Sequence, residues 1–160
     1  MTGKEEKFLV VLREYTGYCE KAGALLDSVV SGETDPEEGY ESLRLLKRQS
    51  RDVQGRLIER LYKAYREPAY ANEARSMVVR MDGIINGAKD IVNTLIVYHK
   101  DETCPEGIRV MIKLIRCAVS EMVKIIGYTD DVEANMMKMD ARCQRIYNME
   151  ERGDNTYRTT

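Results

Sequence analysis

Apolar side chains recur along this chain at steps of three and four residues, the spacing that places them on one face of an α-helix. The pattern predicts helices over residues 4–30, from Asp35-Pro36 onward, from Pro68 to about 99, over 105–126, and after the GYTD segment at 127–130. The breaks are expected near 31–35, 68, 100–105 and 127–130. No stretch alternates apolar and polar residues as a strand does, so the sequence predicts an all-α protein.

The expected apolar rows identify the side chains that should be buried. The row in 4–30 runs from Phe8 to Val29 and includes Tyr15 and Cys19. The rows of the last two helices comprise Ile108, Met111, Ile115, Val119, Met122 and Ile126, and then Val132, Met136, Met139, Cys143 and Ile146. Glu150, Asp154 and Tyr157 continue the last row, which puts two acids on or beside a face where an unpaired charge is costly.

Long helices joined by short turns predict an elongated antiparallel bundle of about five helices in one domain, residues 1–160. The helices within 1–100 should pack as one antiparallel unit. When the first two helices are laid on the last two with an offset near 100 residues, a weak repeat is visible. It indicates a first three-helix repeat over 1–100 and an incomplete second repeat over 104–160, so we expect either self-association through the fifth helix or a longer natural chain.

Composition and charge narrow the function. The 25 basic and 27 acidic residues are interleaved, which argues against nucleic acid as a partner. Four dispersed cysteines with no C-x-x-C indicate reduced thiols and a cytoplasmic protein. The start, MTGKEEKFLVVLREY, is too charged for a signal peptide, and no run is apolar enough to span a membrane. Membrane contact is therefore expected only through a partner.

No enzyme signature is present, and we expect no catalytic activity. The chain lacks a glycine-rich phosphate loop, G-x-S-x-G, H-E-x-x-H, and the Glu-x-x-His pairs of di-iron bundles. The single histidine, His99, fits a packing or helix-terminus role better than a ligand role. The Met136, Met137 and Met139 group fits a core better than a binding surface.

Three segments resemble the PhoU-like family, in particular its shorter members described as phosphate transport regulators. They are LIERLYKAYREP, which ends at Pro68, MDGIINGAKDI, and IYNMEERGDNTYR near the end, and the likeness covers most of the chain. The resemblance implies a bundle of two three-helix repeats whose E-x-x-x-D pairs bind metal clusters on the surface. It also implies a regulatory role in phosphate transport.

Carried over without a gap, the first-repeat metal positions fall on Lys47, Arg51, Asp82 and Asn86, of which only Asp82 keeps an acid. A one-residue slip would select Arg48 and Asp52 instead. Counted from the turn at Pro68, Arg51 and Asp82 lie at similar distances along their two helices, so their side chains could meet. We therefore expect an ion pair of Lys47 or Arg51 with Asp82 where relatives hold metal; a plain solvated face is the alternative. If the pair is exposed, removing Asp82 should cost about 1 kcal/mol or less.

In the second repeat, Glu150 and Asp154 match the family pattern fully. Two carboxylates one turn apart supply only part of a shell for a divalent or ferric ion, so the resemblance implies a partial metal site. Alternatives are capping of the chain end, ion pairs with Arg145 or Arg158, or exposure to solvent.

We therefore expect a regulatory or accessory protein of inorganic phosphate transport that docks on a phosphate transporter or a phosphate-signalling protein. This expectation comes from the resemblance. The alternatives are a metal-binding helical bundle with a redox or storage role and a purely structural helical scaffold.

Overall fold

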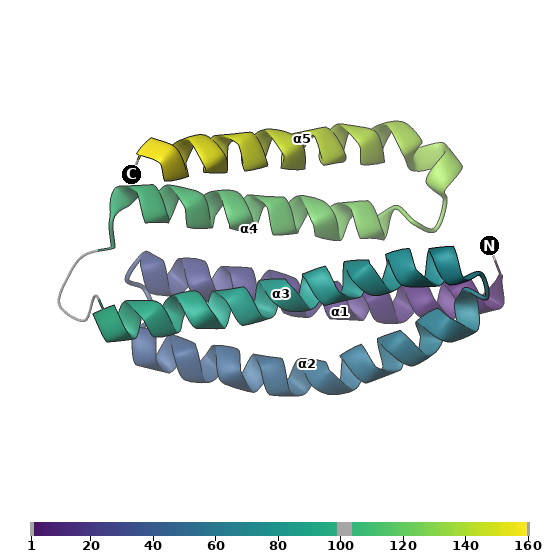
Figure 1. Ribbon diagram of the computed structural model, residues 1–160, viewed down its shortest axis with the longest axis horizontal. Helices are drawn as coiled ribbons and strands as arrows, with labels where there is room; N and C mark the ends of the chain where they lie inside the picture. The colour runs from purple at the N-terminus through teal and green to yellow at the C-terminus, as the bar shows by residue number, and fades with distance from the viewer. Residues whose placement is uncertain (1, 99–103, 160) are drawn as a thin grey trace.

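The protein is an elongated all-α bundle in a computed structural model that describes residues 2–98 and 104–159 (Figure 1). Within these ranges the chain forms five α-helices and no strand, which confirms the predicted fold class. Each helix begins and ends within a few residues of the position predicted from the apolar pattern. The helices are α1 (Gly3–Val30), α2 (Pro36–Ala64), α3 (Pro68–Tyr98), α4 (Glu106–Gly127) and α5 (Val132–Thr159).

Local chemistry fixes the helix ends. Thr2 and Glu5 form a capping box at the start of α1, each side chain bonding the other residue's backbone N–H. The Asp35 side chain accepts bonds from two backbone N–H groups at the start of α2, ahead of a proline in the first turn. Gly32 has a φ of 81°, which lets the chain turn between α1 and α2 at little steric cost.

The core lies among α1, α2 and α3, each of which packs against the other two. The whole apolar row predicted for α1 is buried, and Tyr15 and Cys19 are fully covered. The main contributors from α2 and α3 are Leu43, Leu46, Val53, Leu57, Leu61, Val78, Met81, Ile85, Ala88 and Val92. This unit supplies most of the apolar burial that drives folding.

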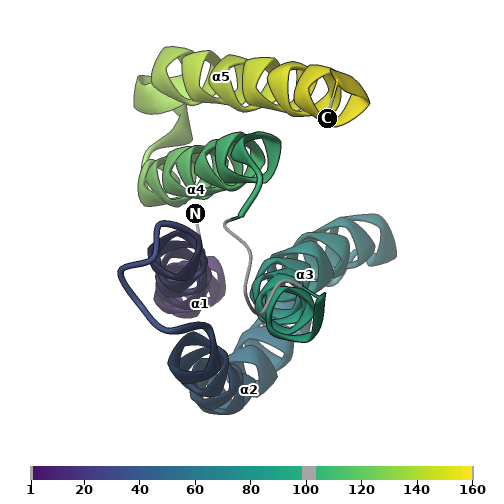
Figure 2. The same ribbon diagram turned by 90° about the vertical axis from the view of Figure 1, so that its left-hand side faces the viewer.

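The remaining two helices lie to one side of this unit. α4 packs against α1, and α5 packs only against α4 (Figure 2). α4 therefore has two covered faces, which corrects its predicted single row. Ile112, Val119 and Ile126 form one buried row and Leu114 and Glu121 the other, whereas Ile115 is 41% exposed.

The contact face of α5 also differs from the expected row. None of its described side chains is buried, and the half-buried ones are Asn135, Met139, Arg142, Ile146, Met149, Gly153 and Thr156. The predicted row is rotated from this face by roughly a quarter turn, sharing only Met139 and Ile146 with it. The rest of that row remains exposed. We call it the α5 flank: Val132, Met136, Cys143, Glu150, Asp154 and Tyr157.

Candidate functional site

Asp82 is the centre of a polar network that joins α1, α2 and α3. Lys47 of α2 forms an ion pair with its Oδ1 atom. The Tyr15 hydroxyl of α1 donates to the same oxygen at 2.8 Å, and the Asn86 amide, one turn along α3, donates to Oδ2 at 2.9 Å. Three donors from three helices thus converge on one carboxylate.

The sequence expectation for this site is met in part. Lys47, Asp82 and Asn86 come together, as the ungapped register predicted, and the Lys47 and Asp82 side chains are only 16% and 20% exposed. The pair is therefore not the surface pair for which a small energetic cost was expected. Arg51 makes no hydrogen bond or ion pair with Asp82 and instead lines a neighbouring basic pocket. Tyr15, the buried donor from α1, was assigned only to the core by its place in an apolar row.

Burial and charge shift the titration of the groups around Asp82. Burial alone would raise the pKa of Asp82, but the hydrogen bonds from Lys47, Tyr15 and Asn86 outweigh it, so that the pKa lies below its ordinary value. Burial, aided by the negative charge of Asp82, raises the pKa of the Cys19 thiol to about 12. Burial, followed by the hydrogen bond to Asp82, raises the pKa of Tyr15. At neutral pH the centre is one carboxylate anion held by one ammonium cation and neutral donors.

The second-repeat acids have a different environment. Glu150 and Asp154 are both exposed on α5 and form no ion pair or hydrogen bond with another described side chain. Arg145, which was a candidate partner, lies 3.5 Å from Glu121 instead. In the part of the chain that the structure describes, no three His, Cys, Asp or Glu side chains gather closely enough to hold a metal ion. The two carboxylates therefore do not make a complete ligand shell by themselves.

A second charged cluster, centred on Glu121 of α4, was not predicted. Its carboxylate is 8% exposed and accepts hydrogen bonds from Lys124 at 2.8 Å and Arg142 of α5 at 2.7 Å. Arg142 also donates to the Tyr128 hydroxyl at 3.2 Å. The bond from Lys124, followed by that from Arg142, lowers the pKa of Glu121 to about 2 despite the opposing effect of burial. The sequence signal was an acid in register with Leu114 on the same helix, followed three residues later by Lys124.

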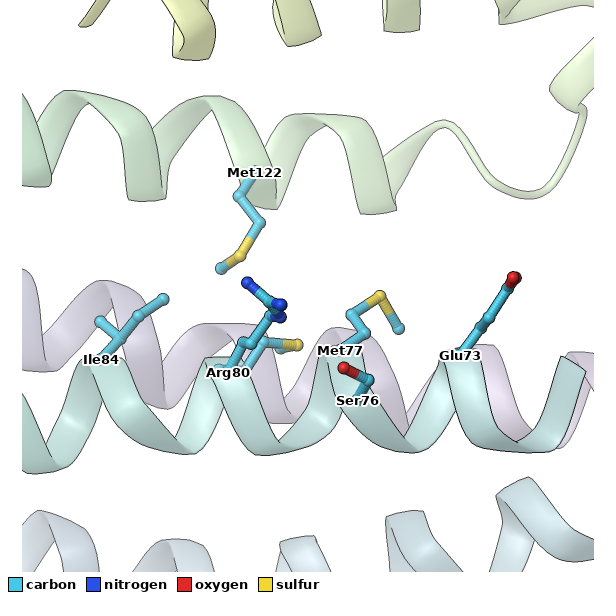
Figure 3. Close-up of a pocket in the computed structure, with 7 residues that line it drawn as sticks. Glu73, Ser76, Met77, Arg80, Ile84 and Met122 are labelled. Atoms are coloured by element: carbon cyan, nitrogen blue, oxygen red, sulfur yellow. The ribbon is translucent and has the colours of Figure 1, made fainter. Parts of the chain in front are cut away.

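A groove separates α3 from α4, whose backbones do not come into contact along the described helices. It has a volume of about 600 Å³. Figure 3 shows Met122 of α4 pointing toward the side chains of α3, where Met77 and Ile84 are half-buried. The full lining is Glu73, Ser76, Met77, Arg80, Met81, Ile84 and Met122. A groove with apolar side chains at its base and polar side chains along its edge is typical of a surface that binds another apolar segment.

The four cysteines are free thiols. Cys117 and Cys143 lie on the surface, Cys104 is half-buried, and Cys19 is buried. Of the three methionines that were expected in the core, Met139 is half-buried, whereas Met136 and Met137 are 59% and 88% exposed. That expectation was wrong for the two exposed residues because α5 has only one neighbouring helix in the described chain. The expected role of His99 lies outside the described residues.

None of the described helices combines the length and the apolar character needed to cross a bilayer. Comparisons with protein-family models, with curated proteins and with solved structures yield no match to this chain.

Proposed function

We propose that the chain is a PhoU-like regulatory or accessory protein of inorganic phosphate transport. It acts in the cytoplasm by docking on a phosphate transporter or a phosphate-signalling protein, and it self-associates through α5. The proposal takes its biological role from the three segments that resemble the PhoU-like family. It takes its mode of action, binding rather than catalysis, from the surfaces of the bundle.

One observation carries the docking role: α5 is a 28-residue helix with no buried side chain among those described. Its flank exposes Val132, Met136 and Tyr157, which are 46%, 59% and 76% accessible. Exposed apolar groups gathered on one helix face are typical of protein-binding sites, because burying them against a partner removes apolar area from water. Glu150 and Asp154 add negative charge to the same flank, which favours a partner surface with lysine or arginine.

Phosphate transport can be measured directly in cells that lack the chain. We expect deletion to alter phosphate uptake and the expression of a phosphate-starvation reporter, and the wild-type chain to restore both. The variant Met136→Glu/Tyr157→Glu should fail to restore them, because it places charge in the apolar part of the α5 flank. Val10→Glu is the matched control, since Val10 is 61% exposed but lies on α1.

Each result has a defined meaning. Circular dichroism and thermal melting of the purified variants should match the wild type, because the altered side chains are exposed. If deletion leaves both uptake and the starvation response unchanged, the transport role is wrong. If the double variant restores both as well as Val10→Glu does, the α5 flank is not the docking surface. Purified protein that holds iron and turns over would favour the redox or storage alternative.

A further inference from the structure

A pocket on the outer side of α2 and α3 is lined only by cations. Its lining residues are Arg44, Lys47, Arg48, Arg51 and Lys89, and its volume is about 340 Å³. Four of the five stand at positions i, i+3, i+4 and i+7 of α2, so their side chains project from one face of the helix. Lys89 is contributed by α3.

The acids near this pocket leave much of its charge uncompensated. Asp82 is occupied by Lys47, Tyr15 and Asn86, and so neutralises only one lysine. Two exposed acids are partners of rim cations: Glu41 lies 3.0 Å from Arg44, and Asp90 lies 3.5 Å from Lys89.

Arg48 and Arg51 make no ion pair or side-chain hydrogen bond within the described ranges, although Asp52 follows Arg51 directly in sequence. Like charges three or four residues apart repel and slightly destabilise a helix. Both arginines are exposed, so neither is needed to neutralise a buried acid of the fold. The N–H donors of the two arginines are therefore open to a ligand in the pocket.

We propose that this pocket binds a phosphate-type oxyanion that carries more than one negative charge. Guanidinium groups present paired N–H donors that match the oxygens of a phosphate group, and lysines add point charges. Several cations around one volume favour a multiply charged tetrahedral anion over a single carboxylate. Lys47 is held in place by Asp82 and still has N–H donors to offer, so the base of the pocket is ordered before a ligand arrives.

The anion site is independent of the proposed transport role, because it rests on the pocket alone and can be tested with purified protein. Isothermal titration calorimetry in phosphate-free buffer at low ionic strength would use three probes. Inorganic phosphate tests a free anion, tripolyphosphate tests a phosphate chain, and acetate at equal ionic strength is the monovalent control. The test variant is Arg48→Gln/Arg51→Gln, which leaves Lys47 and the Asp82 network intact. The control is Arg152→Gln, which removes an exposed arginine from α5.

We expect one phosphate-type ligand per chain, and an affinity that falls as salt is added, because exposed charges are screened. Removing both arginines should weaken binding by at least about tenfold, since each loses charge-assisted hydrogen bonds. Arg152→Gln should bind as the wild type does. Binding of phosphate indicates a free anion, whereas binding of tripolyphosphate alone indicates a phosphate chain, and both support the site.

Three results would overturn the proposal. The first is that neither phosphate probe binds at millimolar concentration. The second is that acetate binds as well as phosphate, which would indicate a loose counterion layer. The third is that Arg48→Gln/Arg51→Gln retains wild-type affinity, or that Arg152→Gln loses as much.

Discussion

Replacing Asp82 with alanine should destabilise the bundle far more than breaking a surface ion pair does. The substitution leaves Lys47, whose side chain is 16% exposed, without its counterion. It also leaves the hydroxyl of Tyr15, a fully buried residue, without its acceptor. Hydrogen bonds to charged groups contribute about 1.5–3 kcal/mol each, and breaking a buried pair costs about 3–5 kcal/mol. Because this pair retains some solvent access, we expect a loss of about 3 kcal/mol.

Chemical and thermal unfolding followed by circular dichroism would measure this loss. For a domain of this size each kcal/mol lowers Tm by about 2–4 °C, so Asp82→Ala should melt roughly 6–12 °C below the wild type. The matched control is Glu59→Ala, which breaks a pair with Lys63 whose side chains are 60% and 54% exposed. Solvent already screens that pair, so its loss should lower Tm far less than Asp82→Ala does.

Two further variants separate charge from hydrogen bonding. Asp82→Asn keeps an acceptor for Tyr15 but removes the anion, so its loss should be smaller than that of Asp82→Ala. Adding Lys47→Met to Asp82→Asn should recover part of the stability, because no unpaired ammonium then remains in the partly buried site. The reasoning would be refuted if Asp82→Ala cost no more than Glu59→Ala.

Three other experiments test separate parts of the bundle. The pKa of Glu121 in the folded state is about 2 against an ordinary value of 4.5, so its contribution to the free energy of unfolding is complete above pH 4.5 and is lost as the pH falls toward 2. Urea unfolding should therefore find that the stability difference between wild type and Glu121→Gln shrinks over that window and stays constant near neutral pH. A thiol reagent should modify the two surface cysteines quickly and Cys19 only on unfolding, as followed by mass spectrometry, because burial keeps its thiol protonated and covered. Gly39→Ala should lower the free energy of unfolding by about 1–3 kcal/mol, because its new Cβ would lie 2.2 Å from a Val29 methyl group. Gly55→Ala has open space around it and should stabilise α2 by about 0.5–1 kcal/mol, and thermal melts of the two variants would compare these effects.

The sequence predicted the fold closely because each helix of the first unit has one dominant apolar face. The row predicted for α1 is fully buried, and Asp35 and Pro68 mark helix starts by their own chemistry. The apolar pattern predicted the buried side chains less well where a helix has two covered faces or few neighbouring helices. Periodicity gives the spacing of a row but not which of two adjacent rows a partner helix covers, and Met139 and Ile146 belong to both rows of α5.

The sequence predicted the candidate site only to the extent that the pairing of two helices fixes the level of a residue along the axis of the bundle. The resemblance selected Lys47, Arg51 and Asp82, and the distance from the turn supported a similar level for Arg51 and Asp82, but neither could select between the two cations. The rotation of α2 decides that choice: both residues line the basic pocket, but only Lys47 also reaches Asp82. Tyr15 and Glu121 were missed for a related reason. A hydroxyl or carboxylate within an apolar row becomes a network member only when another helix supplies its partner, and that contact is long-range in sequence.

Glu150 and Asp154 lead to a final prediction, that metal binding at this pair is weak in a single chain. The two carboxylates lie one helical turn apart and offer at most four oxygens, whereas Ca²⁺ takes six to eight ligands in proteins. No third metal-binding side chain joins them within the described residues. Both acids are exposed, so water satisfies them and little is gained by taking up an ion.

A second copy of the chain could supply the additional ligands, because the acids are exposed on α5, the helix through which we propose self-association. Metal analysis of the monomer after gel filtration should therefore find far less than one tightly held ion per chain, and sedimentation should detect more dimer when Ca²⁺ or ferric ion is added. Glu150→Ala should abolish that metal-dependent increase, whereas Asp140→Ala, which removes another exposed acid of α5, should not. Stoichiometric metal retained by the monomer and lost in Glu150→Ala would contradict the prediction, because it would require ligands that a pair of exposed carboxylates does not supply.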